Sequence, residues 1–356
     1  MHPASARLRP LIAPTANRPL EDALRRKLFL RSGRIGGLGE LEPLALQIGL
    51  VQNSLKPAFH SPQLVVFAGD HGLAVDLADP AGPTTADRVQ QLLQGHAPLT
   101  AFARAQGLDV SVVDSGMSAA MAPHPRLLAR KIAHGTRNAR AGSAMSQDQV
   151  EAAVRAGMEI SAALPGNVVA CAGIGVGSHE SAALLLSRLT GEELASLLSV
   201  APGTIAEPDR PPALQALQAA SSRHADASDP WAVLAAFGGF EMAMLVGVML
   251  SAASRRQLIL VDGMPASAAL LLASRIHPAV PDYCIHCRSH GHPGLDVALK
   301  LLRATALLEL GIESVDGTGA ALVWPLVRSA AAALDDAAEA DRTANGDRTD
   351  EGDQTA

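Results

Sequence analysis

LVVFAGDHG, at residues 64–72, is a short apolar run that leads directly into a glycine, an acid, a histidine and a second glycine. A continuous apolar run of this length predicts a strand buried on both faces, as in a parallel sheet covered by helices. Ligands of such sheets bind beyond the carboxyl ends of the strands, which is where Asp70 and His71 would lie. Two plainer interpretations stay open, in which Asp70 caps the next helix and His71 is a hydrogen-bonded buried histidine.

Short apolar runs alternate with alanine- and leucine-rich helical stretches along the rest of the chain. Besides residues 64–68, strands are expected at residues 110–113, 167–172, 258–261 and 283–286. Helices are expected between them, among others at residues 85–106, 146–164 and 182–189. This alternation predicts an α/β fold with a doubly wound, mainly parallel sheet and right-handed crossovers.

The two ends of the chain supply helices but no strands. Residues 20–30 and 39–52 indicate two helices around a glycine-rich turn, and residues 320–334 indicate another. We expect residues 1–58 and 320–334 to form a small helical domain beside an α/β catalytic domain of residues 59–319.

Composition limits the possible partners. The chain has 356 residues, of which 48% are hydrophobic and 18% charged, enough to bury one large core. Its formal net charge of −6 is matched by residues 335–356 alone, which contain eight acidic residues and two arginines. We expect this polar, acidic segment to be a disordered tail. The rest of the chain then has no basic surface for a phosphate backbone, and nucleic acid is not an expected partner.

Cysteine usage and hydropathy indicate where the protein resides. Three cysteines in a chain of this length do not make a disulfide framework, so we expect a cytoplasmic location. The amino-terminal residues 1–20 contain no apolar core segment, and no secretory signal is expected. Residues 232–250 approach membrane-spanning length, but Gly238, Gly239 and Glu241 interrupt them. A buried helix is therefore expected there, and no membrane partner.

Three glycines in AGIGVGS, residues 172–178, follow one predicted strand and precede an alanine-rich helix. Backbone N–H groups at Gly173, Gly175 and Gly177 could bind a phosphate at such a turn. Close packing of the strand on the helix explains the same glycines, and the spacing is not that of a dinucleotide-binding loop. Both interpretations stay open.

Two motifs in the last quarter of the chain carry candidate chemistry. Asp316 lies in VDGTGA, a turn that opens the last predicted helix, where a carboxylate is either a helix N-cap or a general base. Cys284 and Cys287 with His290 and His292 could hold zinc, but structural zinc sites usually need a second well-spaced pair. The alternative is a strand followed by a polar loop, and we expect no metal there.

Taken in order, these motifs resemble the nicotinate-nucleotide:dimethylbenzimidazole phosphoribosyltransferase family, which makes the α-ribazole phosphate of the cobalamin lower ligand. The resemblance extends over residues 28–334. Its blocks are SGRIGGLGELEPLALQIGLVQ (32–52), VVFAGDHG (65–72), VVDSGM (112–117), DPWAVLAAFGGFEMAM (229–244), VDGMPASAALL (261–271), DY (282–283) and DGTGAAL (316–322). It implies a Rossmann-like sheet, a small domain built from both chain ends, and a homodimer with its site at the carboxyl edge of the strands.

The resemblance also implies the reaction. A carboxylate removes the N–H proton of dimethylbenzimidazole, whose nitrogen attacks the ribose C1′ of nicotinate mononucleotide and expels nicotinate with inversion. The family's catalytic glutamate corresponds to Asp316, which is one methylene shorter. No metal or other cofactor is required, because the pyridinium of the nucleotide is already a good leaving group.

The nucleotide loop of the family matches unevenly. Its sequence, Gly-Glu-Met-Gly-Ile-Gly-Asn-Thr-Thr, aligns with residues 172–180. Gly175 and Gly177 keep two of its glycines, and Gly173 stands in place of its glutamate.

Other substrate positions are replaced. Asp79 and Asp87 lie where the family has a serine and a glutamine for the benzimidazole. Arg288, His290 and His292 replace a histidine, a serine and a glutamate in the later loop, and Arg288 could bind the phosphate through two hydrogen bonds. The residues expected to bind substrate are Asp70, His71, Asp79, Asp87, Gly173, Gly175, Gly177, Ser178, Gly203, Asp262, Gly263, Arg288, His290 and Ser314.

These replacements leave two alternatives open. The chain could be a weak or inactive family member that serves as a binding or partner subunit, or an enzyme of the same reaction type with another acceptor base. The intact AGDHG motif, the Asp262-Gly263 pair and Asp316 favour an enzyme.

Overall fold

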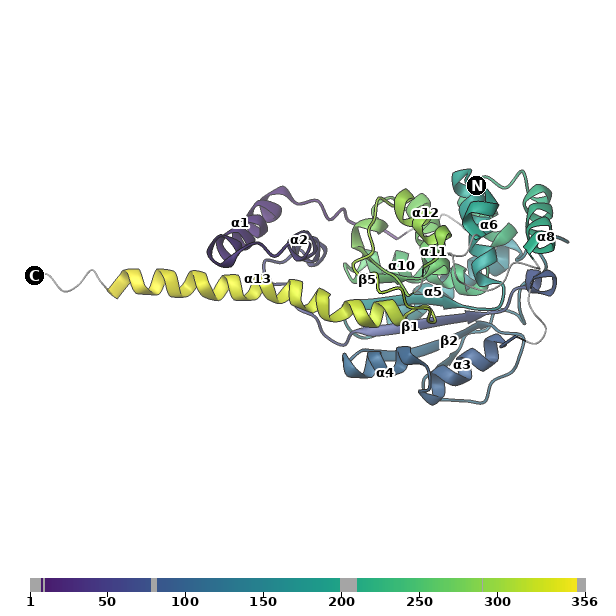
Figure 1. The fold of residues 1–356 in the computed structure, drawn as a ribbon, viewed down its shortest axis with the longest axis horizontal. Coiled ribbons are helices and arrows are strands. Elements are labelled where there is room, and N and C mark those ends of the chain that lie inside the picture. Colours follow the sequence, from purple (N-terminus) through teal and green to yellow (C-terminus); the bar gives the residue numbers. More distant parts are fainter. Residues whose placement is uncertain (1–7, 9, 78–81, 199–209, 290, 351–356) are drawn as a thin grey trace, which may run out of the picture.

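The computed structural model describes residues 8, 10–77, 82–198, 210–289 and 291–350 of the chain. Figure 1 shows a sheet between layers of helices, with one long helix extending from one end beside two shorter ones. The sheet determines where the site lies.

The sheet has six strands, all parallel, in the order β3-β2-β1-β4-β5-β6. Their bounds are β1 Gln63–Gly69, β2 Asp109–Gly116, β3 Leu127–Ala129, β4 Val168–Ile174, β5 Leu258–Asp262 and β6 Cys284–Cys287. Strand order reverses between β1 and β4, so the predicted doubly wound parallel sheet is confirmed. The sequence did not predict β3, because this strand has three residues and none of them is fully buried.

The helices alternate with these strands as expected. Their bounds are α1 Arg18–Ile35, α2 Leu41–Gln52, α3 Thr85–Gln94, α4 Pro98–Ala105, α5 Gln147–Ala163, α6 Ser178–Thr190, α7 Leu194–Leu198, α8 Arg210–Arg223, α9 Pro230–Phe237, α10 Phe240–Ser254, α11 Met264–Ile276, α12 Pro293–Leu301 and α13 Thr318–Asp350, with short 3₁₀ helices η2 Gly72–Asp76 and η3 Val280–Tyr283.

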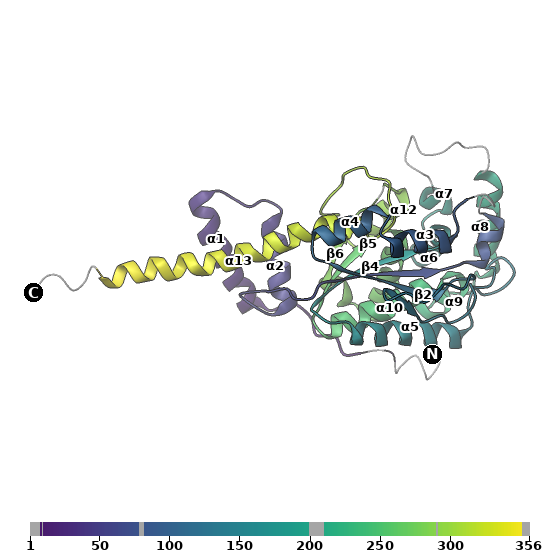
Figure 2. The same cartoon turned by 90° about the horizontal axis from the view of Figure 1, so that it is seen from below.

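Helices cover both faces of the sheet. On one face α10 contacts β1, β2, β4 and β5 and packs against α5, while α3 and α4 lie on the other face against β2 (Figures 1 and 2). Every residue of β1, β4 and β5 is therefore buried, which explains why the sequence shows continuous apolar runs and no alternation. In register, Val66 of β1 pairs with Val112 of β2 and Ala172 of β4, so the carboxyl ends of the three strands lie together.

Two segments expected to be single helices are each two helices. Residues 85–106 form α3 and α4, because Gly95 ends α3 with a left-handed φ of 80° and Pro98 begins α4. Residues 232–250 lie in α9 and α10, which are separated by Gly238 and Gly239 in extended conformation. In the part of the chain that the structure describes, no helix is both long and apolar enough to cross a membrane.

Helices from both chain ends pack together. α1 and α2 contact each other and α13, which runs beside them in both views (Figures 1 and 2). The expected helix end at Leu334 and the disorder expected after it differ from the structure, in which α13 continues to Asp350. The alanine-rich composition of residues 330–340 has high helix propensity, which accounts for the continuation. The division into two domains stays a prediction, and residues 351–356 lie outside the described residues.

Candidate active site

A cavity of about 550 Å³ opens at the carboxyl end of β4, beside the boundary where the strand order reverses. Its walls come from the end of β4, the first turn of α6, the α3–α4 region and the turn before α13. Of the residues that the sequence predicted, Gly173, Gly175, Ser314 and Asp316 line it. The sheet thus brings together glycines and a carboxylate that are about 140 positions apart in the sequence.

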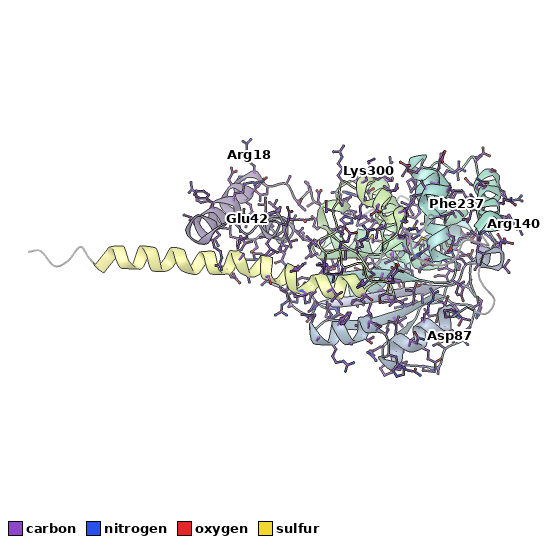
Figure 3. All side chains as sticks on the ribbon, in the orientation of Figure 1. Arg18, Glu42, Asp87, Arg140, Phe237 and Lys300 are labelled. Carbon is purple, nitrogen blue, oxygen red and sulfur yellow. The ribbon has the colours of Figure 1, made fainter. Side chains whose placement is uncertain are left out.

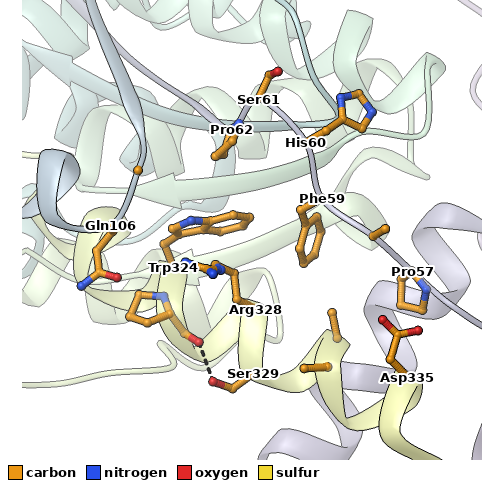
Figure 4. A pocket seen from close by; sticks show the side chains of 15 residues that line it. Pro57, Phe59, His60, Ser61, Pro62, Gln106, Trp324, Arg328, Ser329 and Asp335 are labelled. Carbon is orange, nitrogen blue, oxygen red and sulfur yellow. Dashed lines mark hydrogen bonds between the residues drawn. The ribbon is translucent and has the colours of Figure 1, made fainter. Parts of the chain in front are cut away.

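A larger cavity, of about 680 Å³, lies at the opposite end of the strands, between the segment before β1 and α13 (Figure 4). The rings of Phe59 and Trp324 line it, with centroids 5.0 Å apart, and Arg328 extends along it. None of the predicted substrate-binding residues that the structure describes lies in its wall. Because ligands of doubly wound sheets bind at the carboxyl ends of the strands, the smaller cavity is the candidate site.

Asp262, the last residue of β5, holds the turn that carries Asp316. Its buried Oδ2 accepts hydrogen bonds from Ser289 Oγ at 2.5 Å, Gly317 N at 2.8 Å and Ala320 N at 3.1 Å. Burial, together with the nearby Asp316 carboxylate, raises the pKa of Asp262 to about 6, although these hydrogen bonds oppose the rise. Asp262 therefore organises the start of α13, and its Oδ2 is occupied by protein donors.

Gly263 explains how Asp316 fits against the sheet. It has a left-handed φ of 88°, and a Cβ atom placed on it would lie 2.1 Å from Asp316 Cγ. Only glycine leaves room for the carboxylate at this point. Asp316 is consequently packed tightly, and its side chain is 2% exposed.

His179 is the cavity-lining partner of Asp316. It is the second residue of α6, and its Nε2 lies 3.4 Å from Asp316 Oδ2. Burial lowers the pKa of His179, but the hydrogen bond and the charge of Asp316 outweigh it and raise the pKa above its usual value. The sequence did not single out this residue, because nothing local links position 179 to position 316.

A second histidine–carboxylate pair lies buried next to the site. His71 Nε2 lies 2.7 Å from Glu241 Oε1, and Ser178 Oγ donates to the same oxygen at 2.9 Å. Burial lowers the pKa of His71, but the charge of Glu241 and the hydrogen bond to it raise the pKa above 6.5. His71 thus matches the plainer interpretation of a buried, hydrogen-bonded histidine, and the predicted ligand Ser178 uses its hydroxyl within the protein.

Glu241 was missed as a site residue. In the sequence it is only an acid that interrupts an apolar run, yet a lone carboxylate in such a run needs a buried partner. The need for such a partner was the signal in the sequence that could have identified Glu241 as a site residue. For Asp70 the plainer interpretation of a helix cap is wrong, since His71 and not Asp70 precedes η2 and the Asp70 carboxylate accepts a hydrogen bond from Ser118 N at 2.6 Å.

The glycine loop is explained largely by packing. A Cβ atom on Gly175 would lie 1.9 Å from the carbonyl oxygen of Gly69, and Gly177 has a φ of 85° that favours glycine. Two N–H groups of the loop are used internally, since Val176 N donates to Thr85 Oγ1 at 3.0 Å and Ser178 N donates to Gly175 O. The loop therefore offers fewer free donors to a phosphate than its sequence indicates.

Several predicted residues lie away from the cavity wall. Asp87 forms a capping box with Thr84 at the start of α3 on the periphery of the molecule, and the hydrogen bonds from Thr84 lower its pKa (Figure 3). Arg288 Nη1 binds Asp296 Oδ1 at 2.6 Å and lies 3.6 Å from Glu309 Oε1. Asp79, Gly203 and His290 lie outside the described residues.

The two cysteines of β6 do not face each other. Cys284 and Cys287 are three positions apart in a strand, so their side chains point to opposite faces of the sheet. Both are buried, and burial raises the pKa of both thiols. Within the described ranges no group of three or more histidine, cysteine or acidic side chains could hold a metal ion. Because His290 is not among them, the metal-free interpretation stays a prediction.

Comparison with known proteins agrees with the fold and identifies the family. Residues 13–344 match a protein family described as phosphoribosyltransferase. The chain is 42% identical to the nicotinate-nucleotide–dimethylbenzimidazole phosphoribosyltransferase of Cupriavidus necator over 332 residues, covering 90% of this chain and 94% of the relative. It is 39% identical to the protein of the same name from Variovorax paradoxus, with coverages of 90% and 92%.

A solved structure shows the same fold. The crystal structure of CobT from Thermus thermophilus superposes with a TM-score of 0.81 at 30% identity, covering 89% of this chain and 96% of that one. Sequence and structure agree over most of the chain, and the chain belongs to the nicotinate-nucleotide–dimethylbenzimidazole phosphoribosyltransferase family.

Proposed function

We propose that this protein transfers the 5-phosphoribosyl group of nicotinate mononucleotide to 5,6-dimethylbenzimidazole, giving α-ribazole phosphate and nicotinate. The names of the relatives support the two substrates. The observation that carries the proposal is the position of Asp316, whose carboxylate lines a cavity at the strand-order reversal. The cavity volume of about 550 Å³ lies within the range of small-molecule sites.

The reaction forms one bond and breaks another at the ribose C1′ carbon. A lone pair of the acceptor nitrogen forms the new C1′–N bond, and the electrons of the old C1′–N bond go to the nicotinate nitrogen. The pyridinium nitrogen becomes neutral as it leaves, so the leaving group needs no proton. The protein must therefore orient the two substrates and remove the N–H proton of the acceptor.

Arg88 is the proposed contact for the nucleotide phosphate. Among the described residues that line the cavity, it is the one arginine or lysine. A guanidinium can hold a phosphate through two parallel hydrogen bonds. The sequence directed attention to Arg288 for this role, but that side chain is engaged by Asp296 and Glu309.

The same carboxylate favours catalysis over a binding role. An inactive partner subunit has no need for Asp316 to be supported by Asp262, fitted against Gly263 and paired with His179. We therefore conclude that the site is catalytic.

An assay of nicotinate release tests this function. Purified protein is incubated with nicotinate mononucleotide and, in separate reactions, dimethylbenzimidazole, benzimidazole, adenine or a phenol. We expect nicotinate release to depend on the base and to be fastest with dimethylbenzimidazole. If no nicotinate is released with any of the four bases, the protein is not this transferase. Faster release with adenine or a phenol would instead identify that compound as the acceptor.

We further propose that the protein is a cytoplasmic homodimer that binds neither nucleic acid nor membrane. Two apolar side chains of α1 support a second copy as partner, since Phe29 is 71% and Leu30 42% exposed. The free cysteines Cys171, Cys284 and Cys287 are consistent with a reducing compartment. Light scattering is expected to give about twice the chain mass of 36.7 kDa, and the mass of a single chain would contradict the dimer.

A further inference from the structure

We infer that His179 is the group that takes the N–H proton of the acceptor base, and that Asp316 acts by holding the imidazole in place. This inference rests on the proposed function and concerns the division of labour within that site. Asp316 alone carries this role in the resemblance given above, whereas the structure presents two groups.

Exposure distinguishes the two groups. A general base must come within about 3 Å of the atom whose proton it removes. The side chain of His179 is 34% exposed and that of Asp316 is 2% exposed, although both line the cavity. The imidazole therefore presents the larger surface to a bound substrate.

Packing keeps Asp316 in its place. The carboxyl group fills the position that a Cβ atom on Gly263 would take, and Asp262 fixes the turn through Gly317 N and Ala320 N. An aspartate side chain has a single methylene and therefore a short reach, and Asp316 is held between Gly263 and the turn that Asp262 fixes. His179 belongs to the first turn of α6, from which its longer side chain meets the carboxylate at 3.4 Å.

The charges around His179 suit a proton acceptor. The imidazolium formed by proton transfer would lie beside the Asp316 carboxylate, which stabilises it as the acid of a catalytic triad does. Glu180 on α6 also favours the charged form, and Arg88 on α3 opposes it. The ring of His292, which precedes α12, meets that of His179 edge-on with centroids 5.6 Å apart.

The proton transfer balances without another reactant. One ring nitrogen of the benzimidazole loses its proton to neutral His179, and the lone pair of the other nitrogen forms the bond to C1′. The bond to nicotinate breaks with its electrons on the nicotinate nitrogen, and His179 afterwards releases the proton to water. Because only neutral imidazole accepts a proton, kcat should rise as pH rises through the pKa of His179, which Asp316 places above its usual value.

Substitution of His179 tests the assignment. His179→Gln is expected to lower kcat by roughly 10²-fold or more while KM for the nucleotide changes less than about threefold, and to remove the acid limb of the pH profile. His179→Ala should regain part of its activity when imidazole is added, because the small base can enter the vacated space. His60→Gln is the matched control, since His60 lies at the opposite cavity (Figure 4), and its kcat should equal that of the wild type.

The outcomes separate the inference from the function. Thermal melting identifies which His179 variants are folded, and His179→Asn replaces any that is not. If the wild type releases nicotinate and a folded His179 variant keeps a kcat within about threefold of it, the role of His179 is overturned but the proposed function stands. A loss of activity that imidazole does not restore and that leaves the acid limb in place would likewise assign His179 a merely structural role. No nicotinate release by the wild type would instead refute the proposed function.

Discussion

Asp262 and Asp316 are two carboxylates in one buried corner with different tasks. Asp262 is surrounded by three protein donors and supports the turn, whereas Asp316 meets His179 and the cavity. Burial raises the pKa of Asp262, and the nearby Asp316 carboxylate raises it further, since a second negative charge is costly beside the first. The two carboxylates are therefore distinguished by their hydrogen-bond partners and not by residue type.

The raised pKa of Asp262 predicts a specific pH dependence of stability. In the unfolded chain this carboxyl ionises near pH 3.8, but in the folded protein only near pH 6. Between these values the folded state binds more protons, so the stability contributed by Asp262 is full below pH 3.8 and is lost as pH rises through 6. Relative to Asp262→Asn, the wild type should lose up to roughly 3 kcal/mol of unfolding free energy from pH 4 to pH 7.

Urea unfolding of both proteins across this pH range measures the difference. Comparison with Asp262→Asn cancels the titration of the other groups. A difference between the two proteins that stays constant from pH 4 to pH 7 would show that Asp262 titrates normally.

In helix α3, two neighbouring residues have different roles. Asp87 completes the capping box that begins the helix, while Arg88 lines the cavity. The resemblance assigned Asp87 to the benzimidazole, but its carboxylate accepts from Thr84 N at 2.9 Å and faces the periphery. The glycine loop before α6 is similar, because close contact with Gly69 explains why position 175 is a glycine without any ligand.

Paired substitutions on α3 separate cap from ligand. Arg88→Gln should raise KM for nicotinate mononucleotide about tenfold or more with Tm unchanged, because it removes a charge that faces the phosphate and no buried contact. Asp87→Ala should lower Tm by roughly 1–3 °C and leave both KM values unchanged. Steady-state kinetics and thermal melting of the two variants check this. The reverse pattern, with KM altered by Asp87→Ala and not by Arg88→Gln, would restore the assignment of Asp87 to the substrate.

For the molecule as a whole, the sequence predicted the elements that leave a local pattern of residues. Buried parallel strands are short apolar runs, so β1, β2, β4, β5 and β6 were predictable, whereas β3 is too short and too exposed to leave such a run. The breaks at Gly95 and Gly238 were present in the sequence, but neither glycine shows by itself whether a helix ends or merely contains it.

The pairs that make up the site depend on topology. His71 and Glu241 are 170 positions apart, and His179 and Asp316 are 137 apart. They meet because parallel strands bring distant turns to one edge of the sheet. The resemblance identified Asp316, but only the folded chain shows that a histidine accompanies it and that Asp262 supports its turn.

If this fold transfers a phosphoribosyl group in the cavity that Asp316 lines, the two products must form together. Wild-type protein with nicotinate mononucleotide and dimethylbenzimidazole should form α-ribazole phosphate and nicotinate in equal amounts. Asp316→Asn, which keeps the volume but removes the charge that holds His179, should form both at least about 10²-fold more slowly with KM for the nucleotide little changed. Nicotinate released without α-ribazole phosphate would rule out the transfer, and an Asp316→Asn variant as fast as the wild type would rule out a role for Asp316.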